Sequence, residues 1–141
     1  MSLAEIRPGL VAEKTLVVTE ERTAQHIGSG SLRLLATPAM AMLVERTCLE
    51  LLEPMLQEGQ TTVGSGIRLR HLGPTPLGMT VRARVEVTAV EDRQITFRAE
   101  VWDEVEKVGE GEHSRVVIDV DRFLRRIQSK SDAKKGGTPK A

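Results

Sequence analysis

TPAMAMLVERTCLELLEPML, residues 37–56, is the one long helical pattern in the sequence, and the other segments must pack around it. Thr37 is predicted to cap this helix, and Pro38 suits the first helical position, where no backbone N–H is needed. With about 100° between successive residues, the apolar side chains form one broad arc. The arc predicts that one side of the helix is buried.

Glu45 breaks this pattern, because it falls inside the apolar arc beside Ala41, Cys48 and Leu52. An isolated carboxylate there is destabilising or shifts its pKa upward, so it must find partners. Buried glutamates are uncommon unless they are paired, and Glu45 is therefore the first candidate for chemistry. Cys48, the only cysteine, excludes an internal disulfide and is interpreted as a packed core thiol.

The composition predicts one soluble globular domain, with 141 residues, 40% hydrophobic and 28% charged. No apolar run approaches the ~20 residues that a membrane span needs. The first residues lack the layout of a signal peptide, so a cytoplasmic protein without membrane contact is expected.

The charges are unevenly distributed, although the formal net charge is zero. From Arg122 onward there are seven Lys/Arg and one Asp, so this end carries +6 and the rest of the chain −6. The sequence has no Tyr, two Phe and one Trp. Bases would find no aromatic surface to stack on, so nucleic-acid binding is not expected.

Five segments alternate apolar and polar residues as strands do. They are residues 10–19, 61–72, 79–90, 94–105 and a last strand that follows a turn at 107–111 and runs through Val120. Gly64 and Gly66 predict a bulge or a close backbone approach in the second strand. A hairpin turn is expected at residues 91–93.

A sheet of such strands must bury one face, and the long helix is the only element able to cover it. The expected fold class is α+β, a curved antiparallel sheet wrapped around one central helix. Residues 1–129 form this domain, including a short closing helix at 121–129, and residues 130–141 are expected to be a basic, disordered tail. The open sheet edges favour a homodimer or a higher homo-oligomer.

Three side chains with catalytic potential converge on the interior of this fold. Glu45 faces the sheet, His71 shares a strand face with Leu69, and Thr37 lies at the start of the helix. A hydroxyl, a carboxylate and an imidazole are the parts of a nucleophile–base arrangement. Thr37 also has a simple structural interpretation as a cap, and His71 as a core residue.

The spacing of these residues adds a resemblance. Thr37 and Glu45 are separated by seven residues, and 25 residues separate Glu45 from His71. RHLGPTPLGMTVRARVEV then begins at Arg70, and GEGEHSRVVI spans residues 109–118. Together they resemble the hotdog-fold thioesterases of the fluoroacetyl-CoA thioesterase-like family, over about residues 7–126 of this chain.

The resemblance implies a hotdog fold with active sites at a homodimer interface. It implies that Thr37, Glu45 and His71 are catalytic, and that Gly64, His71 and Arg115 contact a small acyl-CoA substrate. Fluoroacetyl-specific members carry phenylalanines before the helix, where they cover the acyl pocket. Residues 24–35 of this chain contain no aromatic residue, so fluoroacetyl specificity does not follow and short or branched acyl groups are expected.

The expected reaction is hydrolysis of an acyl-CoA thioester. His71 is the expected general base and then protonates the leaving thiolate, while Glu45 and Thr37 either form an acyl-enzyme or activate water. The backbone N–H near Gly64 suits the oxyanion, because glycine lets the carbonyl approach closely. Coenzyme A is part of the substrate, no separate cofactor is expected, and the histidines and the cysteine show no metal-ligand spacing.

Five arginines are candidates for binding the CoA phosphates, since an Arg side chain can bind phosphate as a fork. They are Arg68, Arg70, Arg82, Arg84 and Arg115. A solvated outer sheet face explains most of them equally well. Two other functions stay open: a non-catalytic acyl-CoA sensor, and, with less support, an acyl-CoA hydratase, for which the expected Asp-then-His motif is missing.

Overall fold

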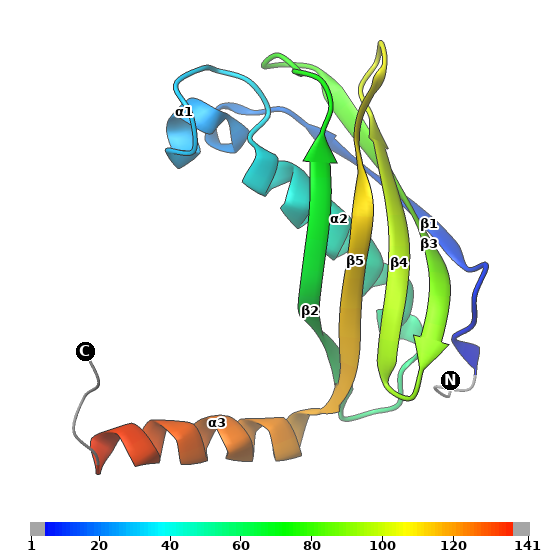
Figure 1. Ribbon diagram of the computed structural model, residues 1–141, viewed down its shortest axis with the longest axis vertical. Coiled ribbons are helices and arrows are strands. Elements are labelled where there is room, and N and C mark those ends of the chain that lie inside the picture. The colour runs from blue at the N-terminus through cyan, green and yellow to red at the C-terminus, as the bar shows by residue number, and fades with distance from the viewer. Residues whose placement is uncertain (1–4, 137–141) are drawn as a thin grey trace.

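The computed structural model describes residues 5–136, in which one curved antiparallel sheet wraps around a long helix (Figure 1). The strands are β1 (Val11–Val17), β2 (Gln60–His71), β3 (Thr80–Glu91), β4 (Gln94–Trp102) and β5 (Lys107–Asp119). The helices are α1 (Ala24–Ile27), α2 (Thr37–Leu52) and α3 (Val120–Lys135), with 3-10 turns η2 (Glu20–Arg22) and η3 (Glu53–Met55). The order in the sheet is β1-β3-β4-β5-β2, which confirms the predicted fold class.

The core lies between α2 and the inner face of the sheet. Alternate side chains of the central strands are fully buried, namely Val81, Ala83, Val85 and Val87 of β3 and Ile95, Phe97, Ala99 and Val101 of β4. They meet the buried side of α2, formed by Ala39, Met40, Leu43, Val44, Thr47, Cys48 and Leu52. Burying a side chain as large as Leu or Phe contributes about 1.5–3 kcal/mol to stability. The apolar side of α2 and the inner face of the sheet therefore stabilise each other. Burial also raises the pKa of the Cys48 thiol to about 12.

The start of α2 differs from the prediction. The cap residue is Ala36, and Thr37 is already helical and makes no capping hydrogen bond. The predicted cap role of Thr37 is therefore wrong, and its hydroxyl is available for another partner. At the other end, Pro54 lies in the 3-10 turn that follows α2, as expected for a residue that ends a helix.

The turn before the last strand was expected at residues 107–111, but it lies at residues 103–106. Asp103 makes this turn, because its carboxylate accepts the backbone N–H groups of Val105 and Glu106 at 2.7 and 2.8 Å. Gly111 is a strand residue instead. A side chain there would overlap the backbone of Arg68 on the neighbouring β2, so glycine serves close strand approach rather than a turn.

Helix α3 continues six residues beyond its predicted end at Ser129, so the disorder expected from residue 130 is wrong for residues 130–135. Residues 137–141 of the expected tail lie outside the described residues. The helix points away from the sheet (Figure 1), and none of its residues is buried. No helix within residues 5–136 is long and apolar enough to cross a bilayer.

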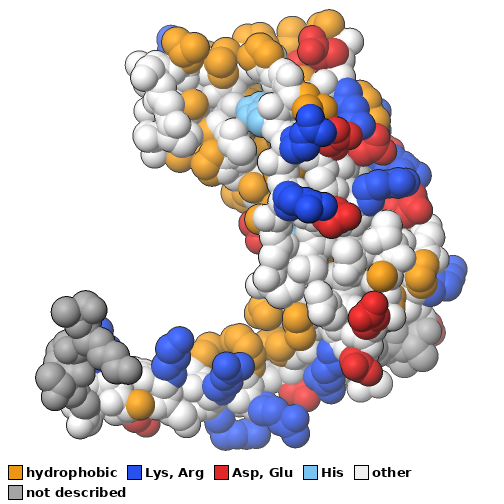
Figure 2. Space-filling model, viewed as in Figure 1, with side chains coloured by type: hydrophobic (Ala, Val, Ile, Leu, Met, Phe, Trp, Pro, Cys, Tyr) orange, Lys and Arg blue, Asp and Glu red, His pale blue; other side chains and the backbone are white. Residues whose placement is uncertain are grey.

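Strand β2 is an edge of the sheet and pairs on one side only, with β5. Its register shifts between Gly64 and Gly66, which confirms the predicted bulge. Residues 64–68 are exposed. Figure 2 shows a hollow bounded by this side of the sheet and by α3, with apolar side chains of α3 turned toward it.

Candidate active site

The end of β2 and the start of α2 bring two of the predicted catalytic residues together. The Thr37 hydroxyl lies 2.8 Å from Nδ1 of His71, close enough for a hydrogen bond. Burial lowers the pKa of His71, and a backbone hydrogen bond at Gly73 opposes this effect. The imidazole is therefore mainly neutral at pH 7, the form in which it can accept a proton.

The other ring nitrogen of His71, Nε2, differs from Nδ1. Nε2 is buried and makes no hydrogen bond within residues 5–136. A buried polar atom left unpaired costs roughly 1–3 kcal/mol, so this nitrogen marks a position where a ligand group or water would be stabilised. His71 also lines an open cavity of about 360 Å³, together with Leu34, Leu35, Leu72, Gly73 and Pro74. Most of this lining is apolar, as suits an acyl group.

Glu45 lies apart from this pair. It is eight residues beyond Thr37 on α2, which is about 12 Å along a helix that rises 1.5 Å per residue. Its side chain is half-buried and turns toward β2, where a Cβ at Gly64 would lie 3.1 Å from Oε2. Gly64 therefore lets the carboxylate approach the strand backbone. Within a single subunit, Glu45 does not lie next to Thr37 and His71.

Arg115 lies beneath the same glycine and is only 6% exposed. Its Nε donates to the Thr62 hydroxyl at 2.8 Å, and Nη2 donates to the Thr62 carbonyl at 3.0 Å. Burial lowers the pKa of Arg115, whereas the nearby charge of Glu45 raises it. A Cβ at Gly64 would lie 3.6 Å from Nη1, so Gly64, Glu45 and Arg115 form one group.

His113 belongs to this group and was not predicted. It is 2% exposed, its Nε2 lies 3.1 Å from Nη1 of Arg115, and its Nδ1 lies 2.7 Å from the Gly66 carbonyl. Arginine only donates hydrogen bonds, so Nε2 accepts and the proton is on Nδ1, which donates to Gly66. Burial lowers the pKa of His113, Arg115 adds to this, and the Gly66 hydrogen bond opposes it.

The signal for His113 was present in the sequence. His113, Arg115 and Val117 are two residues apart on β5, and all three are buried. Period-two alternation around Val117 therefore assigns the histidine and the arginine to the inner face. The ring of His113 also stacks on Phe97 of β4, with centroids 6.5 Å apart, which fixes its plane.

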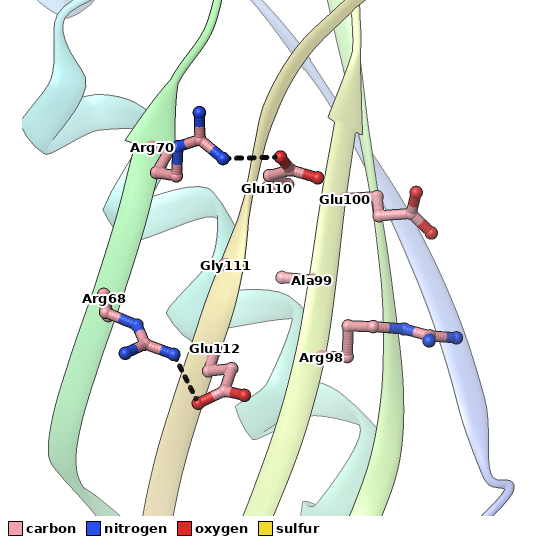
Figure 3. A pocket seen from close by; sticks show the side chains of 8 residues that line it. All are labelled: Arg68, Arg70, Arg98, Ala99, Glu100, Glu110, Gly111 and Glu112. Atoms are coloured by element: carbon pink, nitrogen blue, oxygen red, sulfur yellow. Dashed lines mark hydrogen bonds and ion pairs between the residues drawn. The ribbon is translucent and has the colours of Figure 1, made fainter.

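The other candidate arginines lie on the outer face of the sheet. Arg68 and Arg70 of β2 pair with Glu112 and Glu110 of β5, each at 3.3 Å, along an open groove of about 670 Å³ (Figure 3). These glutamates lie beside the arginines because the β2–β5 register pairs Arg68 with Glu112 and Arg70 with Glu110.

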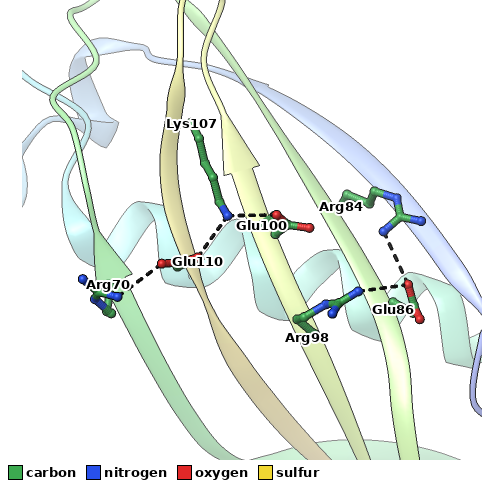
Figure 4. A network of polar contacts seen from close by, with 7 residues as sticks. All are labelled: Arg70, Arg84, Glu86, Arg98, Glu100, Lys107 and Glu110. Carbon is green, nitrogen blue, oxygen red and sulfur yellow. Dashed lines mark hydrogen bonds and ion pairs between the residues drawn. The ribbon is translucent and has the colours of Figure 1, made fainter.

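The arginines of β3 are paired in the same way and lie three strands away from β2. Arg82 pairs with Glu13 at 3.1 Å, and Arg84 pairs with Glu86 at 3.5 Å. Figure 4 shows that Glu86 also contacts Arg98, and that Lys107 bridges two further glutamates. The solvated outer face therefore accounts for these four arginines, and only Arg115 lies inside. Within residues 5–136, no three acidic, His or Cys side chains converge as a metal site would require.

Comparison with known proteins identifies the family. The family model described as fluoroacetyl-CoA-specific thioesterase matches residues 18–121. The fluoroacetyl-CoA thioesterase of Streptantibioticus cattleyicolor is 31% identical over 123 residues, which cover 83% of this chain and 88% of that protein.

Solved structures agree with this match. A variant of the fluoroacetyl-CoA-specific thioesterase FlK, in complex with fluoroacetate and CoA, superposes with a TM-score of 0.80 at 30% identity, covering 84% of this chain and 99% of that one. A thioesterase superfamily member from Thermus thermophilus superposes with a TM-score of 0.83 at 26% identity, covering 94% and 100%. The predicted hotdog fold is confirmed, and the chain belongs to the fluoroacetyl-CoA-specific thioesterase family.

Proposed function

We propose that this thioesterase hydrolyses a small acyl-CoA to the free acid and CoA, with Thr37, Glu45 and His71 as catalytic residues. Gly64, His71 and Arg115 would contact the substrate. The observation that carries the proposal is the Thr37–His71 hydrogen bond of 2.8 Å beside an apolar cavity. It supports the proposal because a neutral imidazole beside an apolar space is what hydrolysis of an acyl thioester requires.

In the proposed reaction an oxygen nucleophile attacks the thioester carbonyl and the C–S bond breaks. His71 accepts the proton of the attacking water and returns it to the departing thiolate. The backbone N–H near Gly64 stabilises the oxyanion that forms on the carbonyl. No cofactor takes part, since CoA enters only as part of the substrate.

Two routes to the free acid differ in the role of Glu45. Its carboxylate either attacks first and forms an acyl-enzyme anhydride, or it orients the water that attacks directly. A single turnover in ¹⁸O-labelled water detects an anhydride that is hydrolysed at the enzyme carbonyl. Hydrolysis of an anhydride at the enzyme carbonyl would leave ¹⁸O in the peptide that contains Glu45, whereas direct attack places the label only in the product acid.

A homodimer would complete the site. The Glu45 group lies about 12 Å from Thr37 along α2, and β2 leaves one edge free. Antiparallel pairing of two β2 strands, centred near Ile67, would set Gly64 of one subunit close to the His71 end of the other. The exposed residues 64–68 are consistent with such pairing. The cytoplasmic location stays a prediction.

A panel of acyl-CoAs, with free thiol as the readout, tests this function. Short and branched acyl groups should be cleaved, without a preference for fluoroacetyl-CoA, because residues 24–35 supply no aromatic cover. Binding without thiol release would contradict the proposal and favour an acyl-CoA sensor. Loss of enoyl absorbance without thiol release would favour a hydratase.

A further inference from the structure

Helix α3 has an apolar strip that the rest of the described chain, residues 5–136, leaves uncovered. Leu124 is 56% exposed and Ile127 is 49% exposed. Together with Phe123 they span an arc of about 100° on a helix with 3.6 residues per turn. Apolar side chains of this helix face the hollow in Figure 2. A strip of this kind on a projecting helix marks a surface for another protein.

The position of α3 relative to β2 limits which protein can cover it. The N–H of Val120, the first residue of α3, donates to the Gly59 carbonyl at 2.9 Å, so the helix starts beside the Gln60 end of β2. His71 is the other end of this strand, about 36 Å away at 3.3 Å per residue. Within one chain, α3 therefore starts far from His71.

Pairing of two β2 strands removes this separation. In an antiparallel pair of identical strands, the beginning of one lies beside the end of the other. The Gln60 end of one subunit, with its attached α3, would then lie beside the partner's His71. A second copy of this chain is thus the occupant that the topology favours.

The surface around His71 is complementary to α3. Its exposed apolar side chains are Leu72, Leu77 and Val105. Next to them, the turn at residues 103–106 carries three acidic residues. Helix α3 presents leucine and isoleucine together with the exposed arginines Arg122, Arg125 and Arg126. Apolar contact with opposite charges around it is typical of a specific interface.

We propose that α3 of each subunit packs over the His71 end of its partner, so that Leu124 and Ile127 form the outer wall of the cavity beside the partner's His71. This inference rests on the proposed homodimer for its geometry and on the proposed function for the use of the cavity. The acyl group would be selected by side chains from two subunits, and the helix would replace the missing aromatic cover.

Cross-linking between subunits tests the geometry without turnover. A Leu72→Cys protein is mixed with a Leu124→Cys protein and treated with a short bis-maleimide. The proposal predicts a cross-linked heterodimer, and the matched control Ser129→Cys, on the opposite side of α3, should give much less. No heterodimer with Leu124→Cys, or an equal yield with Ser129→Cys, would overturn the proposal. The native Cys48 is buried and should not react.

The preference for acyl groups of different length tests whether Leu124 and Ile127 form the outer wall of the cavity. Leu124→Ala and Ile127→Ala should shift the ratio of kcat/KM values toward longer acyl groups by roughly tenfold, since one methylene in an apolar pocket has an effect of this size. Ser129→Ala should leave the ratio unchanged, and melting temperatures show that each variant folds. An unchanged ratio of kcat/KM values in the Leu124 and Ile127 variants would show that these side chains do not line the cavity. If the wild type cleaves no acyl-CoA yet the cross-link forms, the proposed function fails and the placement of α3 stands.

Discussion

The two groups of the candidate site differ in how complete they are within one subunit. At the end of β2, Thr37 and His71 share one hydrogen bond, and Nε2 of the histidine has no partner within the described residues. At the bulge of β2, the side chains of His113 and Arg115 are buried and hydrogen-bonded on several sides. The first group therefore keeps an unused hydrogen-bonding atom for a ligand. The side chains of the second group are already held in position by the protein itself.

The largest expected effect tests whether both groups serve one reaction. Glu45→Gln keeps size but loses charge and basicity, and His71→Ala removes the base. Each should lower kcat by about 10²–10⁴, or roughly 3–5 kcal/mol, with little change in KM. The double variant should be scarcely slower than either single one, because groups that act as a unit are not additive.

Steady-state kinetics on the best acyl-CoA, with melting temperature as the control for folding, measures this effect. A Glu45→Gln enzyme with wild-type kcat would separate the two groups and remove Glu45 from the mechanism. Fully additive losses in the double variant would mean that they act in different steps.

His113 tests whether the second group is a support. In His113→Asn the amide can still donate to Gly66 but cannot reach Arg115, and in His113→Gln an acceptor for Arg115 is retained. An unpaired buried donor costs roughly 1–3 kcal/mol, so Asn should lower kcat/KM by about tenfold or more. The kcat/KM of His113→Gln should be closer to that of the wild type.

Ser114→Ala is the matched control for this experiment. It removes the 2.9 Å hydrogen bond between Ser65 and Ser114 at the same bulge, and it leaves the side-chain hydrogen bonds of Arg115 in place. If Ser114→Ala loses as much activity as His113→Asn, the loss comes from disturbing the bulge. The hydrogen bond between His113 and Arg115 would then have no specific effect on activity.

The pH dependence of stability should reveal the protonation of both His71 and His113. Burial lowers the pKa of His71 and of His113, so between 6.5 and these lowered values the unfolded chain binds more protons than the folded one. Stability is then full above pH 6.5 and is lost as the pH falls through that window. Urea unfolding at several pH values measures the loss, which should be smaller in His113→Gln. Stability that stays constant or rises with acidification would contradict the neutral state of both rings.

The smallest effect is expected on the outer face. Arg68→Gln and Arg70→Gln break exposed ion pairs, which contribute at most about 1 kcal/mol. KM for acyl-CoA should change by less than about twofold, because these arginines are already paired with glutamates. A KM that rises strongly at low salt would show that the outer arginines bind CoA phosphates.

The sequence predicted the architecture because its periodicities are local. Alternation from Val81 to Val87 and the apolar arc of α2 each appear within a few turns or residues of chain. The strand positions are buried as expected, whereas the arc is buried only in part, since Met42 is 44% exposed. The end of α3 was missed because the polar residues after Ser129 carry no burial signal, although they form a helix.

The site was predictable only in part, since its remaining contacts depend on strand register. The partners of Arg68 and Arg70 are 44 and 40 residues away in sequence, and only the β2–β5 pairing brings them close. The predicted role of Thr37 as a cap is wrong, because the cap residue is Ala36, one residue earlier. His113 had the right period, yet its contact with Gly66 follows from the bulge.

Burial of the only cysteine has a chemical consequence for an enzyme that releases a thiol. The thiolate is the form that exchanges with disulfides, and with a pKa of about 12 only about one Cys48 in 10⁵ is ionised at pH 7. In the proposed reaction every turnover frees one CoA thiol. Within the described residues the protein offers no reactive sulfur to this product, so CoA or its oxidised form cannot readily become trapped on the enzyme as a mixed disulfide.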